Sequence, residues 1–301
     1  MTDGSALGLA AALGTAVCWS GTALFFSAGG RRIGSEAVNL TRLLLAVGLL
    51  VAAHRAATGA PLPLDVGSER LGWLVVSGVV GLVIGDVALF EAFVVLGPRL
   101  ATVIMALAPL IAAVLGWAVL GERLAALQLA AIGMAVAGVA TVVTEPPPGA
   151  AGDVGRHDRR GIALGLVGAV GQAGGLIASK LGMAGDYPAL SATLVRIVVA
   201  AAVLWLLAAL RGRVGRVVRA WRDHRALALT ALGAVCGPFL GIWLSLFAVR
   251  EAPVGLASAV MATSPILVLG VEALRGRPVT RRGLAGTAVA VGGVAAMFAV
   301  G

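Results

Sequence analysis

Long apolar segments alternate with short polar breaks along the whole chain of 301 residues. A membrane-spanning helix needs about 20 consecutive, mostly apolar residues. Ten segments meet this requirement, at roughly 6–27, 36–53, 71–93, 98–120, 124–143, 161–182, 188–210, 226–248, 252–274 and 283–300. Most of the breaks are short, which favours antiparallel packing of consecutive helices. The pattern predicts an all-α integral membrane protein with ten transmembrane helices.

Composition excludes the main soluble classes. Hydrophobic residues make up 59% of the chain and charged residues 12%, whereas a soluble domain has roughly 25% charged residues. The mean hydropathy is +1.01. Such a chain cannot supply the polar surface of a soluble enzyme or of a disordered protein. Cys18 and Cys236 both lie inside apolar segments, so a disulfide framework is not expected and small-residue packing is their predicted role.

The two halves of the chain look like copies of each other. Arg42 recurs as Arg196 at an offset of 154, and Pro109 recurs as Pro265 at an offset of 156. An arginine or a proline inside an apolar helix is unusual, so these matches weigh more than matches between alanines. Because five helices are an odd number, the second copy must enter the membrane from the opposite side. We therefore predict two inverted five-helix repeats, 1–144 and 161–301, joined by the polar, proline-rich linker 145–160.

Gly85–Arg123 is the stretch in which the chain resembles a known family most specifically. It is similar to the third and fourth helices of EamA-type members of the drug/metabolite transporter superfamily, with Pro109 in mid-helix and Gly121-Glu122 at the helix end. The resemblance extends over essentially the whole chain and implies a ten-helix transporter with both termini in the cytoplasm. In the second copy Pro265 is present, but Gly276-Arg277 replaces the closing Gly-Glu pair.

The expected function is secondary active transport of a small metabolite, amino acid or drug-like solute by alternating access, with protons as a candidate coupling ion. The expected partners are that substrate and the lipid bilayer, and the protein is expected to be a multi-pass monomer or homodimer of the cell (inner) membrane. Most of the basic residues that produce the net charge of +9 lie in loops between apolar segments. Positive charge in such loops orients a membrane protein more often than it binds nucleic acid. No cofactor, metal site or catalytic residue is expected.

Two other classes of function are compatible with a helical membrane protein. An intramembrane enzyme lacks support because no HExxH or GxSxG motif occurs, and Asp186, the partner that an aspartyl protease would need for Asp86, falls in a Gly-Asp-Tyr-Pro turn. No GxxxxGK[ST] loop is present, so ATP is not expected to drive transport. A non-transporting membrane sensor, scaffold or channel stays an open alternative.

Asp86 is the strongest candidate for chemistry. A charged side chain near the bilayer centre costs roughly 2.5–3.5 kcal/mol on insertion scales, so such a residue is a functional hypothesis by default. Asp86 lies near the middle of the third segment, where we expect a role in substrate binding or proton coupling; the alternative is a carboxylate that bonds to a neighbouring helix for packing. Glu91 is a second candidate for these roles. It lies five residues later on a different face and nearer to the helix end, where the alternative is a carboxylate that reaches water.

The duplicated arginines Arg42 and Arg196 each lie about two turns inside a predicted helix. They could reach the headgroups or bind backbone carbonyls. They could also pair with Asp86 or Glu91, or contact an anionic substrate. Lys180, near the end of the sixth segment, is expected to be a snorkelling anchor, with contact to a ligand as the alternative.

Pro109 and Pro265 each interrupt the backbone hydrogen bonds of a predicted helix. In a transporter such breaks can line a cavity or act as hinges, although membrane helices also tolerate proline for purely structural reasons. Other residues could line the cavity, and for each of them ordinary packing or lipid contact explains the sequence equally well. These residues are Trp19, Ser20, Phe90, Gln172, Trp243 and Ser245.

The orientation of the chain is predicted differently by two arguments. The loops that follow the odd-numbered helices carry 16 basic residues, and the opposite face carries four, or five if Lys180 is included. The positive-inside rule places the richer face in the cytoplasm and both termini outside. The family resemblance implies the reverse. The bias comes from the second half alone, and because the short loop Arg211–Arg225 would be costly to translocate, we expect the termini to be outside.

Overall fold

The computed structural model describes residues 3–144, 159–274 and 280–300, and these residues form helices and short connections without any strand. The first half contains α1 (Asp3–Ile33), α2 (Ser35–Thr58), α3 (Ser68–Ser77), η1 (Gly78–Gly85), α4 (Asp86–Met105), α5 (Ala108–Leu120) and α6 (Ala126–Val143). The second contains α7 (Arg159–Gly182), α8 (Ala189–Leu210), α9 (Val214–Ala220), α10 (His224–Ala234), η2 (Val235–Gly241), α11 (Ile242–Glu251), α12 (Val254–Met261), α13 (Ser264–Leu274) and α14 (Arg281–Val300). Most of the predicted linker, 145–158, lies outside the described residues.

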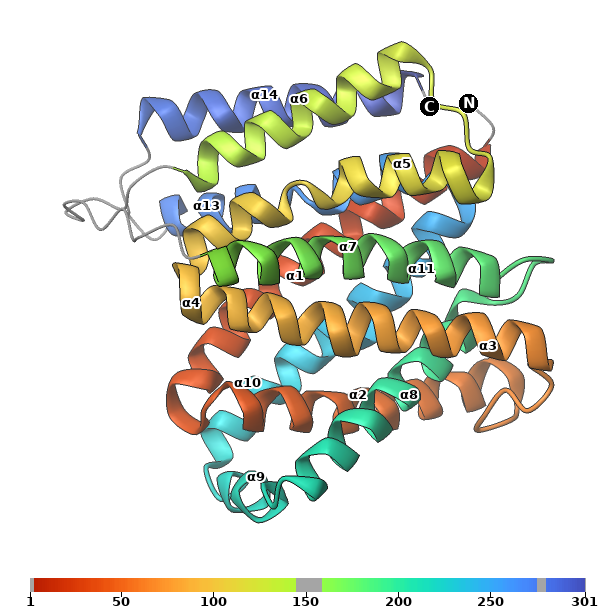
Figure 1. Cartoon of the computed structure of the whole chain (residues 1–301), viewed down its shortest axis with the longest axis vertical. Helices are drawn as coiled ribbons and strands as arrows, with labels where there is room; N and C mark the ends of the chain where they lie inside the picture. The colour runs from red at the N-terminus through yellow and green to blue at the C-terminus, as the bar shows by residue number, and fades with distance from the viewer. Residues whose placement is uncertain (1–2, 145–158, 275–279, 301) are drawn as a thin grey trace.

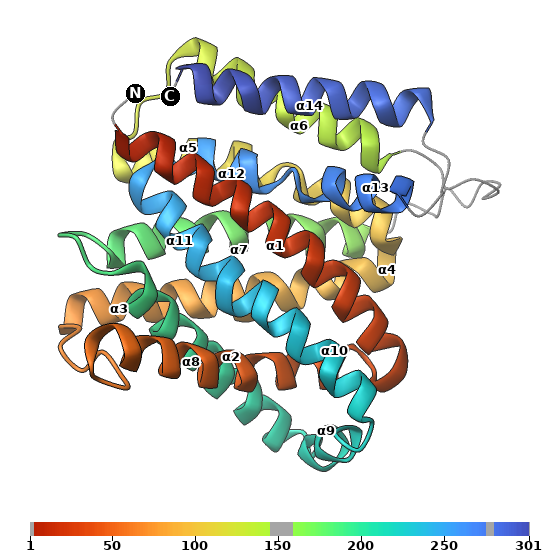
Figure 2. The same cartoon turned by 180° about the vertical axis from the view of Figure 1, so that it is seen from behind.

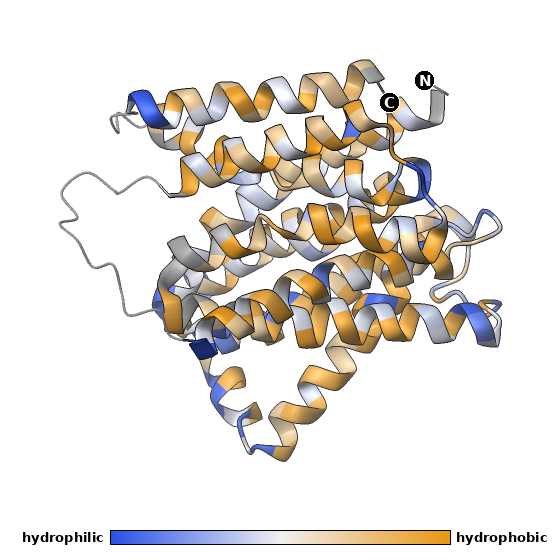
Figure 3. Cartoon of the chain, turned by 45° about the horizontal axis from the view of Figure 1, so that its top comes forward, coloured by the Kyte–Doolittle hydropathy of each residue, from blue (hydrophilic) through white to orange (hydrophobic). Residues whose placement is uncertain are grey.

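The predicted ten-helix architecture is confirmed. Nine helical stretches in the described residues are long and apolar enough to cross a membrane, and the shorter α5, preceded by the last turns of α4, supplies the remaining segment. Helices are the expected solution because a bilayer offers no water to the backbone, so every N–H and C=O must be satisfied within the segment. Figure 3 shows hydrophobic residues along the lengths of the helices and hydrophilic residues mainly near their ends.

Some predicted boundaries are wrong. The helix α4 continues to Met105 through the predicted break at 94–97, and the interruption falls at Ala106–Leu107. The helix α1 extends to Ile33, so that Gly34, with a φ of 84°, forms the whole turn into α2. The predicted loop 211–225 contains the short helix α9. At these places polar residues and glycines predict loops, but a helix can end later than its apolar segment does.

The proline interruptions are present and duplicated. Pro109 lies in the first turn of α5, after a turn that separates it from α4, and Pro265 lies in the first turn of α13, after a turn that separates it from α12. In each case proline begins the second half-helix, where its missing N–H costs no hydrogen bond. Each repeat also contains a π-helical segment, η1 in the first and η2 in the second, and both end at a glycine.

The helices α6 and α14 lie side by side along one edge of the molecule (Figures 1 and 2). They approach closely because a Cβ at Gly138 or Gly286 would collide with the backbone of the partner helix. Small residues permit this kind of packing between membrane helices. Large apolar side chains such as Trp117 and Val114 are exposed on the outside, as expected for a surface that contacts lipid.

The helix α7 packs against η1 in the same manner. A Cβ at Gly171 would lie 2.7 Å from the Cα of Gly85, and a Cβ at Gly175 would lie 2.8 Å from the Cα of Gly81. These two pairs bring a helix of the second repeat into backbone contact with a helix of the first. The contact places Gln172, the neighbour of Gly171, beside the first residue of α4, which is Asp86.

Candidate functional site

A polar cavity of about 130 Å³ lies between the two repeats. Both duplicated arginines and the buried acid contribute to it, so the structure brings together Arg42, Asp86 and Arg196. The full lining consists of Trp19, Thr22, Arg42, Leu82, Asp86, Gln172, Leu176, Arg196, Gly237, Pro238, Ile242 and Ser245. Of the predicted site residues, six are in this set.

Asp86 is held by one group from each repeat. Its Oδ2 accepts a hydrogen bond from Nη2 of Arg42 at 3.0 Å, and its Oδ1 accepts one from Nε2 of Gln172 at 3.2 Å. The side chains of Asp86 and Arg42 are 13% and 12% exposed. The Asp86 carboxylate thus joins helices α2, α4 and α7. Of the contacts considered for Arg42, the structure shows the pairing with Asp86.

Arg42 is positioned by several neighbours. Its Nε donates to Oδ1 of Asn39 at 2.8 Å, one turn earlier in α2, and its guanidinium lies 5.4 Å from the centre of the Phe26 ring. The ring face of an aromatic residue attracts a cation. With Asp86 as its counter-charge, Arg42 is fixed in the cavity wall and does not reach the headgroups.

Arg196 occupies the equivalent place in the second repeat but has different surroundings. It is only 3% exposed, and its Nε has no hydrogen-bond partner. Among the ion pairs of the described residues it takes part in none. With two guanidinium groups and one carboxylate in its lining, the cavity carries a net charge of +1.

A second cavity, of about 160 Å³, adjoins the first and shares Trp19, Gln172 and Leu176 with it. Its lining is mostly apolar, and both Pro109 and Pro265 belong to it. The other lining residues are Met105, Ala106, Ala108, Val139, Ser258, Met261, Ala262 and Ser264. The two duplicated helix breaks therefore face one space, which is the geometry expected if breaks line a cavity.

Other predicted residues lie outside both cavities. Ser20 donates to the carbonyls of Ala16 and Ser264, at 2.7 and 2.9 Å, and so ties α1 to α13. Trp243 packs against Phe239, with 6.1 Å between the ring centres. Glu91 pairs with Arg160 near the molecular surface. The side chain of Phe90 lies outside the described residues.

Lys180, predicted as a snorkelling anchor, makes contacts within the protein. Its Nζ donates to Oε1 of Glu122 at 2.7 Å and to the carbonyl of Ala252 at 2.9 Å. Oε2 of Glu122 in turn accepts from the backbone N–H of Val254 at 2.9 Å, at the start of α12. A carboxylate at a helix N-terminus satisfies a free N–H and complements the helix dipole. We call Lys180, Glu122, Ala252 and Val254 the first cross-repeat cluster; it lies beside the start of α1, where Gly8 contacts Ala252.

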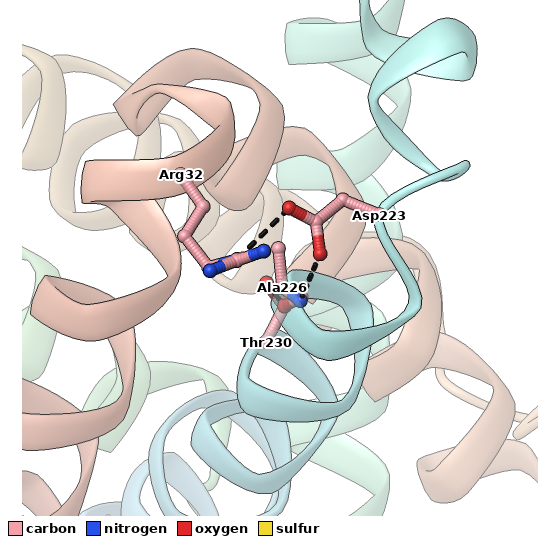
Figure 4. A network of polar contacts seen from close by, with 4 residues as sticks. All are labelled: Arg32, Asp223, Ala226 and Thr230. Carbon is pink, nitrogen blue, oxygen red and sulfur yellow. Dashed lines mark hydrogen bonds and ion pairs between the residues drawn. The ribbon is translucent and has the colours of Figure 1, made fainter.

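A second cross-repeat cluster lies at the other end of α1 (Figure 4). Nε of Arg32 donates to Oδ2 of Asp223 at 2.8 Å, and Oδ1 of Asp223 accepts from the N–H of Ala226 at 2.9 Å, which caps α10. Thr230, one turn later, donates to the carbonyl of Ala226. The Ala226 N–H and the Arg32 guanidinium hold the pKa of Asp223 below its usual range. These four residues form the second cross-repeat cluster.

The π-helical segments line the polar cavity and are not predicted from the sequence. Leu82 in η1 and Gly237 and Pro238 in η2 all line the polar cavity. The next residue after each segment, Asp86 or Ile242, also lines it. Such segments occur often at functional sites. A signal was available in the glycine-rich sequences GVVGLVIG and VCGPFLG, which occupy equivalent places in the two halves.

Comparison with known proteins decides the family. The description EamA-like transporter family applies to residues 6–144 and again to 159–299. The chain belongs to this family. The two matched segments correspond to the two five-helix repeats, so this EamA-like chain is a multi-pass membrane protein of a transporter family.

Structural comparison agrees on the fold. One solved crystal structure superposes with a TM-score of 0.75 at 22% sequence identity, covering 97% of this chain and 94% of the other. At this identity the likeness concerns the fold alone. No curated protein of known function matches the chain. Among the described residues, no group of three or more His, Cys, Asp or Glu side chains could hold a metal ion.

Proposed function

We propose that this EamA-like protein is a secondary active transporter that binds a small solute in the cavity between its repeats and releases it by alternating access. The observation that carries the proposal is the polar cavity itself. Charged groups from both repeats, Arg42, Asp86 and Arg196, line one cavity in an otherwise apolar helix bundle. Intramembrane charges are costly, and a solute that needs them is the simplest reason for three in one place.

The two cross-repeat clusters support a rocking motion. Each joins an element of the first repeat to an element of the second, Glu122 to Lys180 in one and Arg32 to Asp223 in the other. They lie at opposite ends of α1, on either side of the cavities. Opening one end while the other stays joined would expose the cavity to one side of the membrane at a time.

Asp86 is the proposed coupling residue. Protonation would remove its negative charge, break the ion pair with Arg42 and leave two guanidinium groups facing the cavity. A proton and a solute would thereby influence each other through one side chain. This role goes with the proposed location of the protein in the cell (inner) membrane, where a proton gradient is available.

Counterflow in proteoliposomes tests the proposal. Vesicles containing the protein are loaded with a mixture of unlabelled organic acids, amino acids and amines, and entry of each labelled compound is measured. A transporter accumulates at least one labelled compound transiently, whereas a sensor or scaffold accumulates none. Asp86→Asn should abolish uphill accumulation driven by a pH gradient while its abundance stays near that of the wild type. Glu69→Gln, which removes an exposed carboxylate from α3, is the matched control and should behave like the wild type.

The orientation of the chain is measured in cells that express the protein. We expect both termini outside, so a cysteine at position 2, in a background lacking Cys18 and Cys236, should react with an impermeant maleimide in intact cells. Labelling only after permeabilisation would show that the termini are in the cytoplasm and that the charge count is misleading.

A further inference from the structure

We infer that the substrate of this protein is an organic monoanion, an apolar carboxylate whose charged group binds Arg196 and whose apolar part enters the adjoining cavity. The inference rests on the proposed transport function and adds the chemical class of the substrate.

The first observation is the unsatisfied guanidinium of Arg196. A buried polar atom without a partner costs free energy and is rare in folded proteins. Nε of Arg196 is such an atom, in a residue 3% exposed that lines the polar cavity. A guanidinium offers its donors in a planar fork that matches the two oxygens of a carboxylate. The cavity therefore presents the half of an ion pair that a carboxylate would complete.

The second observation is the difference between the repeats at the position after the π-helical segment. In the first repeat this residue is Asp86, which neutralises Arg42; in the second it is Ile242, which cannot neutralise Arg196. Both residues lie in the cavity lining. Asp86 therefore forms an ion pair with Arg42 and acts on Arg196 only through its electrostatic field. A bound anion would supply Arg196 with a directly paired carboxylate.

Cations and zwitterions fit less well. Among the described residues, Asp86 is the only carboxylate that lines either cavity, and both of its oxygens already accept hydrogen bonds, from Arg42 and Gln172. An ammonium group would have to break one of these bonds to gain a counter-charge. A carboxylate needs no such rearrangement at Arg196.

The second cavity sets the nature and size of the remainder. Its lining is apolar except for two serines and Gln172, and its volume is about 160 Å³. An apolar cavity of about 150 Å³ holds one benzene molecule. Because the two cavities share Trp19, Gln172 and Leu176, a carboxylate in one can carry a group in the other. Aryl and branched aliphatic carboxylates with one ring or fewer are therefore the predicted class.

Calorimetric binding to the protein in nanodiscs tests this inference. The probes are phenylacetate, benzoate and isovalerate, with phenylacetamide, phenethylamine and phenylalanine as the neutral, cationic and zwitterionic counterparts. We expect the carboxylates to bind, with phenylacetate at least about tenfold tighter than phenylacetamide, because a charged hydrogen bond in a buried site is lost in the amide. Arg196→Gln should weaken phenylacetate binding by about tenfold or more. Arg196→Lys, which keeps the positive charge, should bind phenylacetate more tightly than Arg196→Gln and less tightly than the wild type. Arg213→Gln, which removes an exposed arginine paired with Glu36, is the matched control and should bind like the wild type.

The inference is overturned if phenylacetamide, phenethylamine or phenylalanine binds as tightly as phenylacetate, or if none of the carboxylates binds. The ligand comparison uses the wild-type protein, so it decides the matter even if Arg196→Gln does not fold. Failure of the proposed function looks different: carboxylates would bind through Arg196 but would show no counterflow. If amines or amides show counterflow and carboxylates do not, the protein is a transporter but its substrate is not an organic anion.

Discussion

The two repeats share a frame and differ in one charge. Each has an arginine in its second helix, a π-helical segment that ends at a glycine, and a proline that begins a half-helix. After the π-helical segment, however, the first repeat has Asp86 and the second has Ile242. The two repeats each contribute one arginine to the cavity. Because the second repeat has Ile242 where the first has Asp86, only one carboxylate accompanies the two arginines, and the cavity keeps a net positive charge.

Because of this difference, the two arginines are expected to contribute differently to stability and to ligand binding. In the first repeat the arginine completes an ion pair within the protein, so it contributes to the native state without any ligand. In the second repeat Nε of Arg196 has no hydrogen-bond partner, which lowers the stability of the protein without a ligand. Residues of the first kind should affect folding and transport together when an apolar side chain replaces them. Residues of the second kind should affect binding first.

The largest effect is expected when the first repeat is made like the second. Asp86→Ile leaves Arg42 buried without a counter-charge, which should destabilise the protein by about 3–5 kcal/mol and abolish transport. The thermal unfolding midpoint of purified protein, together with counterflow, measures both. Glu69→Gln serves as control, and a midpoint within the error of the wild type for Asp86→Ile would show that the Arg42–Asp86 pair contributes little.

The converse change should remove the anion site. Ile242→Asp supplies Arg196 with a carboxylate from the protein, so phenylacetate affinity should fall by about tenfold or more. Calorimetry measures the affinity, and Ile242→Asn, which has nearly the same shape without the charge, should lose much less. Equal losses in the two variants would mean that the size of the residue, not the charge, matters at this position.

A smaller, kinetic effect is expected at the helix breaks. Pro109→Ala or Pro265→Ala allows the interrupted helix to close, so the repeats should rock more slowly while the ligand still binds. Counterflow rates are expected to fall several-fold in both variants, with unchanged affinity in calorimetry. If affinity falls and the rate at saturation does not, the prolines shape the cavity and do not act as hinges.

The smallest effect concerns the exposed second cross-repeat cluster. Since hydrogen bonds lower the pKa of Asp223 in the folded protein, the carboxylate stabilises the fold above its ordinary pKa of about 3.9. This contribution is lost as the pH falls below about 4 through the lowered folded value. Unfolding midpoints at pH 6 and pH 3.5 should therefore differ more in the wild type than in Asp223→Asn. An identical pH dependence in the two proteins would count against the cap.

The sequence predicts the frame well because its signals are local or duplicated. Apolar segment length indicates the helices, and the recurrence of Arg42 and Pro109 at nearly one offset indicates the repeats. It also marks Asp86, since an acid in mid-membrane is rare. The helix ends at Ile33 and Met105 were missed because polar residues and glycines there continue the helix.

Pairings between distant helices were beyond the sequence. Arg42 could be assigned to headgroups, to Asp86 or to Glu91 until the packing of α7 on η1 fixed the place of the acid. The same holds for Lys180, whose partner Glu122 is 58 residues away. The π-helical segments were missed because no periodic pattern marks one inserted residue.

Alternating access of the cavity is the central claim, and site-directed labelling of Ser245→Cys tests it most directly. The background is Cys18→Ala with Cys236→Ala, and the reagent is a membrane-impermeant anionic methanethiosulfonate. Ser245 lines the polar cavity and is 2% exposed. One protein is first locked by a disulfide between Gly8→Cys and Ala252→Cys, and another by a disulfide between Gly29→Cys and Thr230→Cys. A Cβ at Gly8 would lie 2.9 Å from the Cβ of Ala252, and a Cβ at Gly29 would lie 3.3 Å from Oγ1 of Thr230, so each pair is near enough for a disulfide. The account predicts labelling from either side in the unlocked protein, and from opposite single sides in the two locked proteins. Labelling from the same side in both locked proteins would contradict it.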